Sequence, residues 1–105
     1  MKIQISTDSH VEGGLDVEAE ILERVQNGLS RFSSQVTRIE LHVGDENSGA
    51  KGGAKDIRCT LEARVAGRDP TVVRHDAANV DQATEGAIRK MRRVLDTALG
   101  KAGRR

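Results

Sequence analysis

The alternation of hydrophobic and polar residues predicts four β-strands in this chain. Ile3 and Ile5 alternate with polar residues at the start of the sequence, and longer runs of the same kind follow. A period of two is typical of strands that bury one face and expose the other. The predicted strands are Lys2–Ser6, Thr37–Val43, Ile57–Val65 and Thr71–His75.

Two stretches have apolar residues at three- and four-residue steps, which predicts amphipathic helices. The first covers Val17–Phe32, with Asp16 as its candidate N-cap. The second covers Asn79–Leu99 and stops at Gly100, a residue that commonly ends helices. Its predicted buried stripe comprises Val80, Ala83, Ala87, Met91, Val94 and Ala98.

The order β-α-β-β-β-α predicts an α+β fold in which two helices pack on one face of a four-stranded sheet. At 105 residues, we expect one domain over residues 1–100 and a basic flexible tail over 101–105. The segment Asp45–Ala54 is rich in glycine and polar residues, which predicts a flexible connection between adjacent strands. Gly67 is expected to shape a tight turn over Ala66–Pro70.

Composition indicates a soluble intracellular protein with an aliphatic core. Phe32 is the single aromatic residue, so Val, Ile, Leu and Ala must fill the interior. The single cysteine, Cys59, cannot form an internal disulfide, which fits a reducing cytoplasm. We find no signal-peptide pattern and no apolar run near the ~20 residues that span a bilayer.

Charge is separated along the sequence although the chain as a whole has a net charge of +1. Residues 86–105 contain seven basic residues and one acidic residue, whereas residues 1–85 contain ten basic and fifteen acidic residues. Such asymmetry favours binding of a polyanion by the basic end, most plausibly a nucleic acid.

The basic residues of the second helix span its predicted solvent side, opposite the apolar stripe. They could equally form a solvated structural face, since Glu85 can pair with Arg89 and Asp96 with Arg92. If the partner is nucleic acid, the lack of exposed aromatic residues argues against stacking on single-stranded bases. Backbone contacts to folded RNA fit better.

No arrangement of residues predicts catalysis, a metal site or a small-molecule cofactor. The spacing of His10, His42, His75 and Cys59 fits no usual zinc pattern, and Cys59 should face inward while His42 faces outward. Asp8, His10 and Glu12 are interpreted as a polar loop, and the glycines of residues 44–53 do not form a phosphate-binding loop. Cys59 is interpreted as a small core residue. We therefore expect no enzyme activity.

Read in this order, the chain resembles the ribosome hibernation promoting factor and ribosome-associated inhibitor family, also called sigma-54 modulation proteins. The resemblance extends over nearly the whole chain and is closest to the short form, without a C-terminal dimerisation domain. The segments that carry it are MKIQIS, LSRF, VTRIELHV, IRCTLEARV and VDQATEGAIRKMRRVL.

The resemblance implies a double-stranded-RNA-binding-domain-like fold that docks on 16S rRNA of the small ribosomal subunit. There it would occlude the mRNA and tRNA channel under stress or in stationary phase, and it would be a monomer off the ribosome. The alternative is a protein-interaction module of the same fold that does not bind ribosomes. By position, the first helix would contribute Arg24 and Arg31 to rRNA binding. The last helix and tail would contribute Arg89, Lys90, Arg92, Arg93, Lys101, Arg104 and Arg105.

Overall fold

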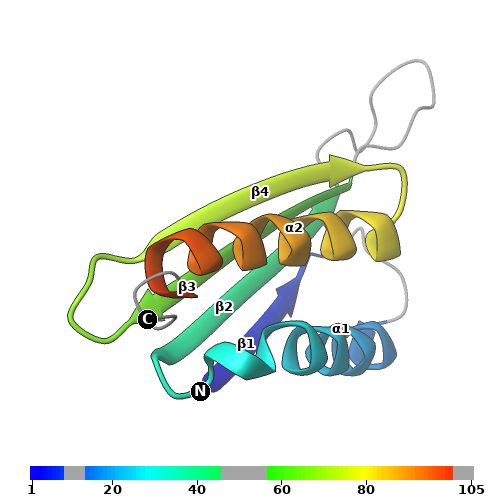
Figure 1. Cartoon of the computed structure of the whole chain (residues 1–105). Coiled ribbons are helices and arrows are strands. Elements are labelled where there is room, and N and C mark those ends of the chain that lie inside the picture. Colours follow the sequence, from blue (N-terminus) through cyan, green and yellow to red (C-terminus); the bar gives the residue numbers. More distant parts are fainter. Residues whose placement is uncertain (9–13, 46–56, 101–105) are drawn as a thin grey trace.

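The computed structural model describes residues 1–8, 14–45 and 57–100. A 3-10 turn at Ser30–Phe32 extends the first helix, and a π-helical turn at Asp96–Gly100 extends the second. The predicted fold class and element order are confirmed (Figure 1). In chain order the elements are β1 (Lys2–Thr7), α1 (Gly14–Leu29), β2 (Val36–Asp45), β3 (Ile57–Val65), β4 (Thr71–Ala77) and α2 (Val80–Leu95).

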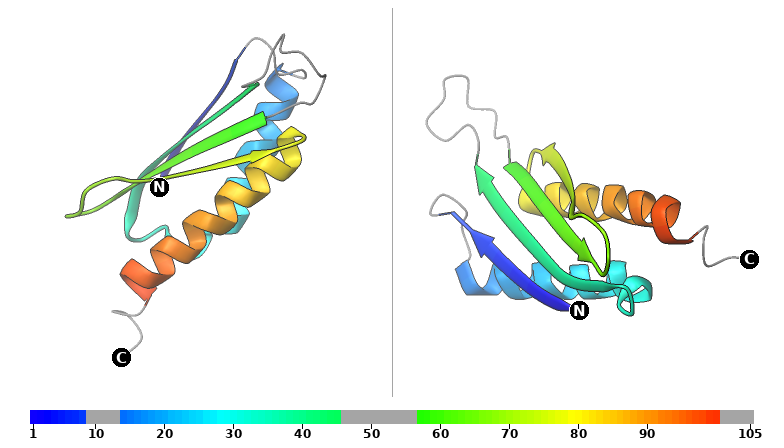
Figure 2. Two further views of the ribbon diagram at one scale, coloured as in Figure 1. Left: turned by 90° about the horizontal axis from the view of Figure 1, so that it is seen from above. Right: turned by 90° about the vertical axis from the view of Figure 1, so that its left-hand side faces the viewer.

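The four described strands form one sheet in the order β1-β2-β3-β4. β1 and β2 are parallel, whereas β2 with β3 and β3 with β4 are antiparallel. Parallel neighbours need a crossover connection, which α1 supplies. Both helices lie on the same face of the sheet, and Figure 2 shows the other face bare of helices. β1 and β4 are the two edges.

The core lies between the sheet and the two helices. Ile5, Leu41, Leu61 and Val73 are aligned across the four strands by register, so they form one apolar row on the inner face. The helices cover this face with buried side chains such as Met91 of α2. The predicted inward position of Cys59 is confirmed, because its side chain is fully buried. The alternation of the sequence therefore identified the correct face of each strand.

Two local predictions were wrong. α1 begins at Gly14, so Asp16 lies in its first turn rather than at the N-cap. A carboxylate there still interacts favourably with the positive end of the helix dipole. Val94, predicted to be buried, is 38% exposed. It lies one turn after Lys90 on the side of α2 that passes the edge of the sheet, where no further described strand covers it.

The turn between β3 and β4 has the predicted form, since Gly67 has a positive φ of 77° that favours glycine. α2 begins with a side-chain cap, in which the backbone N–H of Gln82 donates to Asn79 Oδ1 at 2.8 Å. The predicted loop at Asp45–Ala54, apart from Asp45, lies outside the described residues, as does the tail 101–105. No helix in the described ranges is long and apolar enough to cross a membrane.

Candidate nucleic-acid interface

α2 presents four exposed basic side chains to solvent: Arg89, Lys90, Arg92 and Arg93, here called the basic helix face. They are exposed because the intervening positions Ile88, Met91 and Leu95 are buried against the sheet and α1. The remaining positions around a helix with this pattern face the solvent. The predicted solvent-facing position of the four side chains is therefore confirmed.

The basic helix face spans the full width of α2. On one side, Arg92 extends toward α1, with Nη1 3.9 Å from the position that a Cβ atom would take at Gly28. On the other side, the Lys90 ammonium donates to the main-chain oxygen of Arg74 in β4, at 2.7 Å. Around the helix axis, Arg89 and Arg93 lie between Arg92 and Lys90. The positive charge thus reaches from α1 to the edge strand.

Two arginines, Arg24 in α1 and Arg31 in the 3-10 turn that extends it, pair with carboxylates of α2 and of its π-helical extension across the seam between the helices. Arg24 lies 3.4 Å from Asp81 and 3.8 Å from Glu85. Arg31 donates to Asp96 at 2.6 Å. The Arg31 guanidinium also lies 4.7 Å from the centroid of the Phe32 ring, a cation–π contact.

The predicted pairs of Glu85 with Arg89 and of Asp96 with Arg92 were wrong, because Glu85 pairs with Arg24 of α1 and Asp96 pairs with Arg31 of the 3-10 turn. The two helices approach closely where Gly28 faces Ile88, and a methyl group at Gly28 would be 2.6 Å from Ile88 Cγ2. Such close packing brings the arginines of one helix within reach of the carboxylates of the other. Arg89, Arg92 and Arg93 consequently have no ion pair with any residue in the described part of the chain.

The nine residues predicted to contact rRNA therefore divide into three groups. The four of α2 form one exposed surface. Arg24 in α1 and Arg31 in the 3-10 turn are engaged by carboxylates of α2 and of its π-helical extension. Lys101, Arg104 and Arg105 lie outside the described residues.

Sequence reasoning missed a basic groove beside the basic helix face. This β4 groove is lined by Arg58, Arg74, His75, Asp76 and Lys90. Arg58 donates two hydrogen bonds to the Asp76 carboxylate, at 2.8 and 3.1 Å. They hold the pKa of Asp76 below its ordinary value, with a further contribution from the positive charge of Lys90. The signal that could have found Arg74 is its outward position in the period-two pattern of an edge strand.

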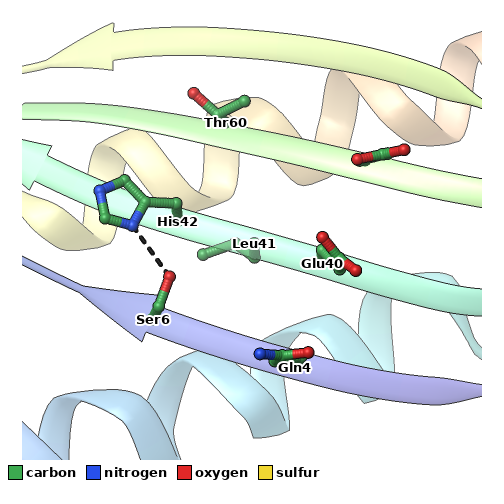
Figure 3. A pocket seen from close by; sticks show the side chains of 7 residues that line it. Gln4, Ser6, Glu40, Leu41, His42 and Thr60 are labelled. Atoms are coloured by element: carbon green, nitrogen blue, oxygen red, sulfur yellow. Dashed lines mark hydrogen bonds between the residues drawn. The ribbon is translucent and has the colours of Figure 1, made fainter.

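The open face of the sheet carries a small polar pocket of about 150 Å³, lined by residues that include Gln4, Glu40 and Thr60. Ser6 Oγ and His42 Nδ1 lie 2.9 Å apart across β1 and β2 (Figure 3). The outward position predicted for His42 is confirmed. Among the described residues, no three His, Cys, Asp or Glu side chains gather as a metal site would require.

Comparison with known proteins finds the same fold among solved structures. No protein-family model matches the sequence, and no curated protein matches it. Among solved structures, a ribosomal subunit interface protein from Coxiella burnetii has a TM-score of 0.65 and 14% identity, over 100% of both chains. The N-terminal domain of Thermus thermophilus Protein Y has a TM-score of 0.64 and 12% identity, over 87% of this chain and 91% of that chain. At these identities the likeness establishes a shared fold, and it agrees with the family resemblance drawn from the sequence.

Proposed function

We propose that this protein is a non-enzymatic ribosome hibernation factor that binds 16S rRNA of the small subunit through the basic helix face. Bound in the channel used by mRNA and tRNA, it would inhibit translation by steric occlusion, in the cytoplasm and under stress or in stationary phase. The observation that carries the proposal is the set of exposed cations on α2, whose acidic neighbours are engaged by Arg24 and Arg31. The shared fold with a ribosomal subunit interface protein supports it.

Phosphate recognition fits the chemistry of this surface. Arginine guanidinium groups bind phosphate oxygens through paired N–H donors, and they keep their charge at any physiological pH. Three of the four cations on the basic helix face are arginines. Contacts of this kind position a protein on RNA without reading its sequence, which suits a factor that recognises the shape of one rRNA surface.

The test is co-sedimentation with purified small ribosomal subunits over a salt series from ~0.05 to ~0.2 M, where counterion release makes phosphate contacts weaken steeply. Arg89→Gln with Arg93→Gln should reduce binding at least tenfold. Arg24→Gln with Arg31→Gln is the matched control, because it removes the same charge from arginines that already have carboxylate partners. It should reduce binding much less than the α2 pair does, since the guanidinium groups of Arg24 and Arg31 are already engaged by carboxylates and are less available to phosphate.

Wild-type protein that fails to sediment with small subunits at low salt, or that binds equally at all salt concentrations, would refute the proposal. The alternative function, a protein-interaction module working through the open sheet face, makes a different prediction. Its partner would remain bound when Arg89 and Arg93 are replaced, because both side chains lie on the helical side of the sheet.

A further inference from the structure

Among the described residues, the basic side chains without an ion pair are concentrated on one side of the molecule. Five of the twelve described lysines and arginines have a carboxylate partner, as Arg38 does with Glu40 and Arg64 with Glu62. Six of the seven that form no ion pair lie on α2, on β4 or in the turn before β4. The seven are Lys2, Arg68, Arg74, Arg89, Lys90, Arg92 and Arg93.

The contact between Lys90 and Arg74 links α2 to the outer edge of the sheet. The Lys90 ammonium reaches β4 and donates to the main-chain oxygen of Arg74. An ammonium group has three donors, so two remain for another acceptor. The Arg74 side chain belongs to the exposed, outward set of β4, opposite the half-buried set that includes Val73 and His75. Both side chains line the β4 groove.

The other side of the helical layer is unsuited to a polyanion. The exposed surface of α1 carries Asp16, Glu20 and Glu23, and its one arginine, Arg24, is engaged by carboxylates of α2. A phosphate backbone that crossed α1 would meet repulsion from these carboxylates. A polyanion bound to the basic helix face is therefore expected to extend from α2 toward β4 and not toward α1.

We propose that bound RNA runs from the basic helix face over the edge of β4, with a backbone phosphate held between the Lys90 ammonium and the Arg74 guanidinium. This inference rests on the proposed function and adds to it the path of the RNA across the protein and one specific phosphate contact. Arg58 lies in the same groove, with its guanidinium held by Asp76. Its role is to neutralise that carboxylate, so that the groove does not repel the phosphate.

The experiment compares Arg74→Glu with Lys2→Glu for binding of small ribosomal subunits. The two substitutions change the charge equally at exposed positions, but Lys2 lies on the opposite edge strand. Arg74→Glu should weaken binding at least tenfold and reduce the slope of log K against log salt by about one unit, as expected for one lost phosphate contact. Lys2→Glu should change affinity less than about threefold and leave the slope unchanged. Arg74→Ala serves as a second variant and should reduce the slope in the same way.

The possible results separate this inference from the function on which it rests. Wild-type binding together with equal effects of Arg74→Glu and Lys2→Glu would overturn the path over β4 and leave the proposed function intact. Absence of wild-type binding would overturn both. Thermal unfolding monitored by circular dichroism shows whether each variant is folded, and because both positions are exposed we expect unchanged melting curves.

Discussion

At the scale of single residues, Cys59 gives a pH-dependent prediction. Burial raises the pKa of its thiol from 9.0 to about 12. Below pH 9.0 the thiol is protonated in the folded and unfolded states, so its contribution to stability is complete there. As the pH rises toward about 12, the unfolded chain loses the proton first, and the free energy of unfolding falls.

Urea unfolding measures this effect when it is performed at pH values of about 8 and about 10.5. The wild type should lose about 2 kcal/mol more than Cys59→Ala does over that range, at about 1.4 kcal/mol for each pH unit above the pKa of the thiol in the unfolded chain. The thiol should also resist alkylation at about pH 8 in the native protein, because it is protonated and buried. An equal change in the free energy of unfolding with pH in the wild type and in Cys59→Ala would contradict the raised pKa of the Cys59 thiol.

At the scale of elements, the packing of α1 against α2 depends on Gly28. A methyl group there would be 2.6 Å from Ile88 Cγ2, which is buried and cannot move freely. Overpacking costs about 1 to 3 kcal/mol, more than the roughly 1 kcal/mol that alanine gains over glycine in a helix. We expect Gly28→Ala to lower the free energy of unfolding by about 1 kcal/mol. The exposed neighbour Asn27 is the control, since Asn27→Ala should stabilise α1 by about 0.5 kcal/mol in the same urea titration.

The elements also show how far the sequence could predict this molecule. Strand faces and the solvent side of α2 follow from periods of two and 3.6, which depend on local residues alone. The partners of Glu85 and Asp96 could not be predicted in this way, because they depend on how α1 lies against α2. Arg74 was missed for the same reason, since its contact with Lys90 joins two elements that periodicity does not place together.

At the scale of the whole molecule, the helical layer is electrically polar, with the basic helix face on α2 and exposed carboxylates on α1. Oriented charge of this kind steers association more than it stabilises the final complex. Neutralising the acidic side by Glu20→Gln with Glu23→Gln should therefore speed association with small subunits about threefold at ~0.01 M salt, where charges interact over ~30 Å. At ~0.15 M salt the interaction range shrinks to ~8 Å, and the variant should associate at nearly the wild-type rate.

The dissociation rate shows whether Glu20 and Glu23 act on the RNA only from a distance or lie against it in the complex. If RNA follows α2 and the edge of β4, the side chains of Glu20 and Glu23 do not touch it, and the dissociation rate should match that of the wild type at both salt concentrations. Surface plasmon resonance with immobilised small subunits measures both rates. Slower dissociation of the variant at ~0.15 M salt would mean that rRNA lies against α1 as well, because screening leaves only near neighbours to act at that ionic strength.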